Sequence, residues 1–279
     1  MDAWIAPHLT GGLGNRLFEF AAAAGASEYW NLPLVFNNDY ITKNDHGLQD
    51  TICKLFPDVP RISDKENVHM YLEPRGECFI YRPLPQTPPS SKVVIDGWRQ
   101  TAWYFPKSQP LQPVWERMVS ADRQAELAVK YGLQTEEKKY GVWFLHIRLG
   151  DYKVLPHHQI NILPYYLQCL DKIPRGSRLI LFSDEPHLCM QWAAKECAVR
   201  LLDFQVCEES DEVESLWLMS QIWGGAIVAN STFSWWGAYF ARHTTPVPET
   251  YVAFYPSVWG QGLPEARDVV PSWGRKVAI

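Results

Sequence analysis

Short apolar runs alternate with helix-like stretches along the first part of the chain. Trp4 to Leu9 predicts a buried strand, Asn15 to Trp30 an alanine-rich helix, and Leu32 to Phe36 a second strand. A strand, a helix and a strand within so short a segment are typical of a βαβ unit. Lys92 to Trp98 predicts another buried strand. Residues 57–92 are rich in proline and have little periodicity, and residues 111–134 predict a helix.

The second half of the chain repeats the alternation of strand and helix. Strands are predicted within GVWFLHIRLGD, over Arg178 to Glu185 and over Gly225 to Ser231, and helices over Pro164 to Leu170, Pro186 to Glu196, Glu214 to Trp223 and SWWGAYFARH. Repeated strand-then-helix segments predict a mostly parallel, doubly wound sheet. The charged stretch from Thr135 to Lys139 separates the two halves. We therefore expect an α/β protein with two Rossmann-like domains facing a cleft, over residues 1–135 and 140–279.

Composition excludes several classes of protein. The 279 residues are 47% hydrophobic and 20% charged with a net charge of −5, which is typical of a globular chain and argues against a nucleic-acid binder. Six scattered cysteines without a C-x-x-C pair predict buried thiols, not a zinc site or a disulfide framework. No apolar run reaches the roughly 18 residues of a membrane span. We expect a cytoplasmic protein with no integral membrane segment.

A glycine cluster follows the first predicted strand. Gly11 to Arg16 reads GGLGNR, which lacks the G-K-[ST] of a P-loop. Leu17 stands where the third glycine of G-x-G-x-x-G would be, which argues against a Rossmann dehydrogenase. A tight turn before a helix exposes backbone N–H groups that suit a phosphate, and Asn15 and Arg16 could add donors. The structural alternative is a turn that needs glycine for a positive φ.

Three further polar clusters follow predicted strands, where open α/β sheets bind their ligands. In HIRLGDY, Arg148 could bind a phosphate with two hydrogen bonds, and His146 shares its face of the strand. Asp151 could hold Arg148 in place or act as a general base. Ser183-Asp184-Glu185 ends a second strand. Asn230 to Ser234 supply either helix caps or a second phosphate cradle.

At these residues the chain resembles the α-1,2-fucosyltransferases of glycosyltransferase family 11. The motifs that carry the resemblance, in the family's order, are GGLGNRLFEFAAA, DGWRQTAWYF, HIRLGDY, LFSDE and MSQIWGGAIVANSTFSWWGAY. They extend from Gly11 to Tyr239, and the last is highly specific. The resemblance implies a GT-B-like fold and an inverting, metal-independent transfer of fucose from GDP-L-fucose to a hydroxyl of a glycan acceptor. It implies no cofactor and no metal, and no D-x-D occurs in the sequence.

The resemblance also implies how the site is divided. The second half would bind the nucleotide sugar and the first half the acceptor. Arg148 and backbone N–H groups would stabilise the charge that develops on the departing diphosphate. The expected donor-binding residues are Gly12, Leu13, Gly14, Asn15, Arg16, His146, Arg148, Ser183, Asp184, Asn230, Ser231, Thr232, Phe233 and Ser234. The acceptor-side candidates are Asp39, His46, Trp98 and Arg99, and the general base stays open among Asp39, His46, Asp96 and Asp151.

Two positions depart from the family pattern. Leu149 stands where the family has a second Arg, and Arg16 replaces a Gln of the glycine motif. The loss of one guanidinium from the donor site leaves a UDP-sugar such as UDP-xylose as an alternative donor. A non-catalytic module that binds a carbohydrate or nucleotide is the alternative from another class.

Overall fold

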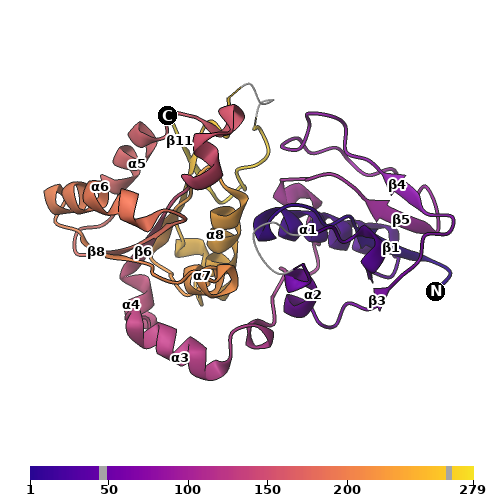
Figure 1. The fold of residues 1–279 in the computed structure, drawn as a ribbon, viewed down its shortest axis with the longest axis horizontal. Coiled ribbons are helices and arrows are strands. Elements are labelled where there is room, and N and C mark those ends of the chain that lie inside the picture. The colour runs from indigo at the N-terminus through magenta and orange to yellow at the C-terminus, as the bar shows by residue number, and fades with distance from the viewer. Residues whose placement is uncertain (44–48, 262–265) are drawn as a thin grey trace. The chain divides into compact units, whose positions relative to one another are not determined.

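The chain folds as two compact units, which are described separately below (Figure 1). The computed structural model describes residues 1–43, 49–261 and 266–279. Unit 1 comprises Met1–Met118 with the described residues of Pro264–Pro271, and unit 2 comprises the described residues of Val119–Leu263 with Ser272–Ile279. Each unit contains parallel strands connected by helices, as the sequence predicts.

Unit 1 is built on a small parallel sheet in the order β1-β5-β4. On the other side of β1, Ile5 forms a parallel bridge with Leu34, just before β2. β2 then pairs in parallel with β3. The strands are β1 (Trp4–Pro7), β2 (Phe36–Asn37), β3 (Arg61–Ile62), β4 (His69–Tyr71) and β5 (Lys92–Ile95). The predicted strand at Leu32 to Phe36 is thus reduced to a bridge and a two-residue strand.

Helix α1 (Leu13–Trp30) forms the core of unit 1 with this sheet. Its small side chains Ala22, Ala23 and Ala26 lie in one buried cluster with strand residues such as Ile5 and Val93. The shorter helical segments of the unit are η1 (Asn38–Tyr40), α2 (Thr51–Leu55), η2 (Ala102–Tyr104) and η3 (Trp115–Arg117). The alanine-rich sequence therefore allows a close approach of helix and sheet.

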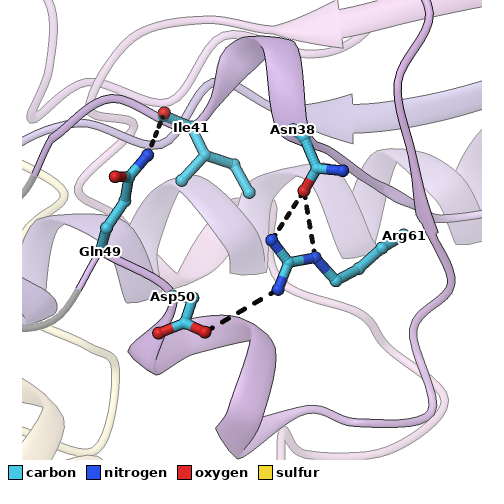
Figure 2. A pocket seen from close by; sticks show the side chains of 5 residues that line it. All are labelled: Asn38, Ile41, Gln49, Asp50 and Arg61. Atoms are coloured by element: carbon cyan, nitrogen blue, oxygen red, sulfur yellow. Dashed lines mark hydrogen bonds and ion pairs between the residues drawn. The ribbon is translucent and has the colours of Figure 1, made fainter.

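A polar cavity of about 380 Å³ lies in unit 1 beside η1, α2 and β3. Figure 2 shows the guanidinium of Arg61 donating to Oδ1 of Asn38 at 2.7 Å, with Asp50 3.9 Å away. Ile41 and Gln49 complete the lining. The guanidinium in this cavity is thus already held by side chains of the protein.

Unit 2 contains six parallel strands in the order β11-β10-β9-β6-β7-β8. The chain enters at the centre with β6, runs outward through β7 and β8, and returns to β9 on the other side of β6. The direction of progression thus reverses between β6 and β9. The strands are β6 (Val142–Ile147), β7 (Arg178–Ser183), β8 (Asp203–Val206), β9 (Gly225–Ile227), β10 (Ala253–Pro256) and β11 (Arg275–Val277). Of these, β8, β10 and β11 were not predicted.

The connecting helices cover this sheet and bury its residues. Tyr165 is fully buried, and its hydroxyl lies 2.7 Å from the carbonyl oxygens of both Val228 and Phe254 and donates its single proton between them, which joins α5 to the sheet. Trp235 and Trp236 at the start of α8 are also fully buried, so both rings are part of the core of unit 2. The helical segments of unit 2 are α3 (Ala121–Lys130), α4 (Glu136–Tyr140), η4 (Gly150–Lys153), η5 (Pro156–His158), α5 (Leu163–Leu170), α6 (Pro186–Val199), α7 (Glu212–Ser220), α8 (Thr232–Thr244) and η6 (Pro248–Thr250).

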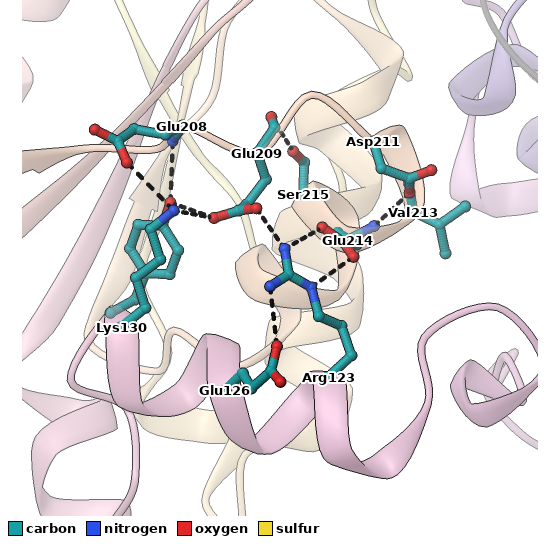
Figure 3. Close-up of polar contacts among 10 residues, drawn as sticks. Arg123, Glu126, Lys130, Glu208, Glu209, Asp211, Val213, Glu214 and Ser215 are labelled. Carbon is teal, nitrogen blue, oxygen red and sulfur yellow. Dashed lines mark hydrogen bonds and ion pairs between the residues drawn. The ribbon is translucent and has the colours of Figure 1, made fainter.

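The units divide at Val119, earlier in the chain than the predicted boundary at Thr135 to Lys139. Helix α3 belongs to unit 2 because ion pairs hold it there (Figure 3). Arg123 donates to Glu209 at 2.7 Å and to Glu214 at 2.8 Å, and Lys130 donates to Glu209 at 2.7 Å. Glu209 is largely buried, so these pairs are better shielded from water than most surface pairs. The charged stretch that predicted a linker instead contains the short helix α4.

No helix in the described part of the chain is long and apolar enough to cross a membrane. α1, with 18 residues, contains Arg16, Glu19 and Glu28. All six cysteines are described and unpaired, and five of them are buried.

Replacement of Gly25 by alanine should destabilise the protein. A Cβ atom there would lie 1.8 Å from the backbone oxygen of Tyr104, so helix and loop would have to move apart. Overpacking of this kind costs about 1–3 kcal/mol. Gly141→Ala is the matched control, because its φ is −78° and its Cβ would have no contact under 3.6 Å. Urea unfolding should show a lower midpoint for G25A only, and equal midpoints would contradict the close approach.

Candidate functional site

The carboxyl edge of the unit 2 sheet brings three of the predicted clusters together. They follow β9, β6 and β7, which are adjacent strands. Ile147 pairs with Ser183 across β6 and β7, and Leu145 pairs with Ile227 across β6 and β9. The reversal between β6 and β9 lies at the same edge, and this is where open α/β sheets bind ligands.

Arg148 lies at the centre of this edge, between two carboxylates. Its Nη2 is 2.7 Å from Oδ1 of Asp151, and its Nη1 is 3.1 Å from Oδ2 of Asp184. The guanidinium also lies 5.5 Å from the ring centroid of Tyr152. The Arg148 side chain is 25% exposed, so water and small ligands reach it. The guanidinium has five N–H donors, so an anion can bind those that the two carboxylates leave or take the place of one carboxylate.

Asp184 also fixes the loop that carries Arg148. Its Oδ1 accepts a hydrogen bond from the backbone N–H of Leu149 at 2.9 Å. A Cβ atom on Gly150 would lie 2.2 Å from Oδ2 of Asp184, so this close approach requires glycine. Asp184 therefore positions Arg148, and Gly150 of HIRLGDY leaves the space that the Asp184 side chain occupies.

Ser183 acts locally at the end of β7. Its hydroxyl accepts a hydrogen bond from the N–H of Glu185 at 3.1 Å and lies 3.3 Å from Sγ of Cys189. Lys153 of η4 forms an ion pair with Glu185. The predicted strand end is thus tied to the loop after β6.

Tyr152 joins the loops after β6 and β9, a role that the sequence did not indicate. Its hydroxyl donates to the carbonyl of Asn230 at 3.0 Å, and its ring stacks on His158 with centroids 4.1 Å apart. Burial raises the pKa of Tyr152 to about 12, so the phenol stays protonated and able to donate. Its place at the end of HIRLGDY is the only signal in the sequence.

His146 lies in the protein interior. Burial, with the nearby charge of Arg148, lowers the pKa of His146 to about 3, so the ring is neutral. Its ring centroid lies 6.0 Å from that of Phe233, and its carbonyl accepts a hydrogen bond from Tyr166. The predicted donor-binding role of His146 stays a prediction, and the ring lies buried at the end of β6.

The segment from Asn230 to Ser234 forms the start of α8. Asn230 donates to the carbonyl of Trp259 at 3.1 Å, and Oγ of Ser234 accepts from the N–H of Ala229 at 3.2 Å. These side chains hold the turn in shape. Ser231 occupies the N-cap position, and α8 begins at Thr232. The positive end of the α8 dipole therefore lies at the carboxyl edge that carries Arg148.

The glycine loop of unit 1 is a tight turn before α1. Gly11 has a φ of +63°, Gly12 is the N-cap, and α1 begins at Leu13. Arg16 is fully buried and donates to three backbone carbonyls, those of Gly11, Thr42 and Gln49, at 2.7–2.9 Å. This contradicts the expectation that its side chain faces a ligand: Arg16 instead binds the backbone of Thr42 and Gln49.

Asn15 and Glu19 also stabilise this turn. Oδ1 of Asn15 accepts a hydrogen bond from Gln100 at 3.1 Å, so it too contacts the protein. The carboxylate of Glu19 accepts hydrogen bonds from the N–H and hydroxyl of Thr10. Burial raises the pKa of Glu19 to about 8 despite these bonds and the nearby Arg16.

The predicted acceptor-side residues have different surroundings in unit 1. Arg99 is buried, donates to the carbonyl of Tyr71 and lies against two tyrosine rings, so its acceptor-side role is corrected to a structural one. Trp98 is 47% exposed. Asp39 forms an ion pair with Lys65 at 3.4 Å. His46 lies outside the described residues.

In the described part of the chain, no group of three or more His, Cys, Asp or Glu side chains is arranged to hold a metal ion. Metal independence itself remains a prediction from the resemblance.

Curated proteins and solved structures resemble the chain, while no family model matches it. The O-antigen biosynthesis glycosyltransferase WbnK of Escherichia coli is 29% identical over 136 residues, which are 46% of this chain and 42% of that protein. An alpha-1,2-colitosyltransferase of Escherichia coli is 32% identical over 106 residues, 36% of each. The fucosyltransferase NodZ from Bradyrhizobium superposes with a TM-score of 0.51 at 13% identity over 85% of this chain and 92% of that one.

These findings confirm the resemblance to fucosyltransferase-like glycosyltransferases and the GT-B-like fold with two Rossmann-like units. The matched segments span less than half of either curated relative. The structural match shows the fold, and the named relatives are glycosyltransferases.

The buried Glu19 should make stability fall as the pH rises. Its folded pKa of about 8 lies above the ordinary value of 4.5, so the folded state keeps a proton that the unfolded state loses between these pH values. One such proton contributes a slope of up to about 1.4 kcal/mol per pH unit. Urea unfolding between pH 5 and 8 should show a shallower decline for Glu19→Gln than for the wild type. Parallel curves would show that Glu19 is ionised in the folded state.

Proposed function

We propose that this protein is an inverting glycosyltransferase. It moves a sugar, L-fucose by resemblance, from a nucleoside-diphosphate donor to a hydroxyl of a glycan acceptor. The observation that carries the proposal is the position of Arg148 at the reversal point of the unit 2 sheet, in a motif that resembles those of fucosyltransferases. The two curated glycosyltransferases support the same class of reaction.

The arrangement suits a departing diphosphate. As the bond from the sugar to the phosphate breaks, negative charge develops on the phosphate oxygen, and fixed positive groups nearby lower the barrier. Arg148 supplies a guanidinium fork, and the start of α8 at Thr232 and Phe233 supplies the positive end of a helix dipole. A charge-assisted hydrogen bond contributes about 1.5–3 kcal/mol, so loss of Arg148 has a measurable effect.

Asp151 and Asp184 act on Arg148 in different ways. Asp184 bonds both the guanidinium and the N–H of Leu149, so it holds the loop as well as the charge. Asp151 is the more exposed carboxylate, at 37%, and makes a single contact with Arg148. We expect the diphosphate to replace Asp151 on the guanidinium while Asp184 stays in place.

Leu149 keeps the identity of the donor open. Its side chain packs against the core of unit 2, where the family has a second Arg. One relative is named for colitose and the solved structure for fucose. GDP-L-fucose is the donor that the resemblance favours, and a UDP-sugar such as UDP-xylose is the alternative. The proposed transfer needs neither cofactor nor metal, and the proposed acceptor is a glycan.

Removal of Arg148 should weaken transfer while the fold persists. Arg148→Ala should lower kcat/KM for the donor by about 10- to 100-fold, the equivalent of one charge-assisted bond. Arg175→Ala, an exposed arginine in the loop before β7, is the matched control and should retain full activity. Transfer should be assayed with GDP-L-fucose and a panel of UDP-sugars, with and without EDTA.

Each outcome of this assay is informative. Transfer from a UDP-sugar alone would overturn the fucosyl donor but keep the reaction class. Donor binding by the wild type with neither transfer nor hydrolysis would support a non-catalytic binding module. Equal activity of the Arg148 and Arg175 variants would contradict the proposed site.

A further inference from the structure

Unit 1 has its own reversal point, and a histidine and an aspartate meet there. β1 and β5 are adjacent and parallel, with Pro7 opposite Ile95, so His8 and Asp96 are the next residue of each strand. On one side of β1 lies the segment that leads into β2, the next strand in the chain. On the other side of β1 lies β5, and β4 lies beyond β5. The direction of progression therefore reverses between β1 and β5. In unit 2 the same topological position holds Arg148.

The two side chains form a hydrogen-bonded pair. Nδ1 of His8 donates to Oδ1 of Asp96, since a carboxylate oxygen can only accept. This fixes the proton on Nδ1 and leaves the lone pair of Nε2 to accept another proton. Within the described residues, Nε2 has no hydrogen-bond partner, and the side chains of His8 and Asp96 are 27% and 30% exposed. The ring of Tyr40 lies edge-on to His8 at 6.3 Å.

The other charged groups described at this edge are already occupied. Glu19 is buried and bonded to Thr10, and both oxygens of Glu73 accept backbone N–H groups, those of Trp98 and Arg99. The guanidiniums of Arg16 and Arg99 are buried. His8 and Asp96 are thus the partly exposed acid–base pair of this edge.

Two of the other candidates for the base, Asp39 and Asp151, are ion-paired, and the third, His46, lies outside the described residues. Asp39 contacts Lys65 and Asp151 contacts Arg148, so each of these two carboxylates is already engaged with a cation of its own unit. Trp98, two residues after Asp96, is exposed and offers an aromatic face to an acceptor. The sequence identified Asp96 as one candidate among four but did not indicate His8, because a single histidine after an apolar run is usually structural.

We propose that His8 is the general base of the transfer, with Asp96 as its positioning residue. The inference rests on the proposed function. Nε2 of His8 takes the proton of the acceptor hydroxyl while the hydroxyl oxygen bonds to the anomeric carbon. The bond from that carbon to the phosphate oxygen breaks, and its electron pair leaves with the nucleoside diphosphate. The imidazolium that forms is stabilised by the Asp96 carboxylate.

The test compares His8→Ala, His8→Asn and Asp96→Asn with a matched control, His69→Ala. His69 lies on β4 of the same sheet and is exposed. A general base contributes about 10²–10⁴-fold, so kcat for transfer should fall by that factor in H8A and H8N. The amide of H8N can still donate to Asp96, which separates loss of the base from loss of the contact. The D96N variant should lose less activity than H8A. Its kcat for transfer should fall, while its KM for the donor should stay unchanged.

Chemical rescue distinguishes a base from a structural histidine. Added imidazole should restore part of the H8A activity and leave H69A unchanged. Stabilisation of each variant by the donor nucleotide, measured as a shift in Tm, should equal that of the wild type. Two results would overturn the dyad and leave the proposed function intact, provided that the wild type transfers the sugar. One is a kcat of H8A and H8N within about threefold of the wild-type kcat. The other is an H8A variant that imidazole does not rescue. A wild type that neither binds nor transfers any nucleotide sugar would overturn both.

Discussion

The pairing of β6 with β7 on one side and β9 on the other determines the chemistry of unit 2. Because all three strands are parallel, the residues that follow them emerge at one edge of the sheet. The guanidinium of Arg148 and the carboxylates of Asp151 and Asp184 meet there, at the start of α8. A shift of one residue in the β6 register would turn Arg148 to the opposite face and separate it from Asp184.

Unit 1 uses the same topology with shorter strands and different chemistry. Its reversal point lies between β1 and β5 and holds His8 and Asp96 instead of an arginine. The glycine loop that follows β1 is tied by Arg16 to the backbone of Thr42 and Gln49, because the guanidinium bonds their carbonyls and that of Gly11. The two units thus place a cationic group and an acid–base pair at equivalent positions of their sheets. Group transfer needs both functions.

The sequence predicted the parts of the fold that have strong local patterns. The strands β6 and β7 are long buried runs, and α1 and α8 follow recognisable motifs, so their positions agree with the structure. β3 and β4 have two and three residues, too few to show an alternation of polar and apolar positions. The boundary at Val119 depends on ion pairs between Arg123 and glutamates about 90 residues later, and no local pattern reveals such contacts.

The sequence indicated which polar residues lie near the strand ends, but not which of their side chains face outward. The motifs located Arg148 and Asp184, and their contact follows from strand order. His146, Arg16 and Arg99 were also expected to meet ligands, but each is buried in its unit. Whether a polar side chain near a strand end faces outward depends on packing around it. Tyr152 and His8 went unnoticed for the converse reason: their roles depend on the partners Asn230 and Asp96, far away in the sequence.

If Arg148 binds the diphosphate of a nucleotide sugar, a crystal structure of the chain with GDP shows it directly. We expect phosphate oxygens within about 3.2 Å of the Arg148 guanidinium. We also expect Asp151 to be displaced from Nη2 while Asp184 remains bonded to the N–H of Leu149. GDP bound elsewhere, for example in the cavity beside Arg61, with Arg148 still bridging Asp151 and Asp184, would contradict this binding.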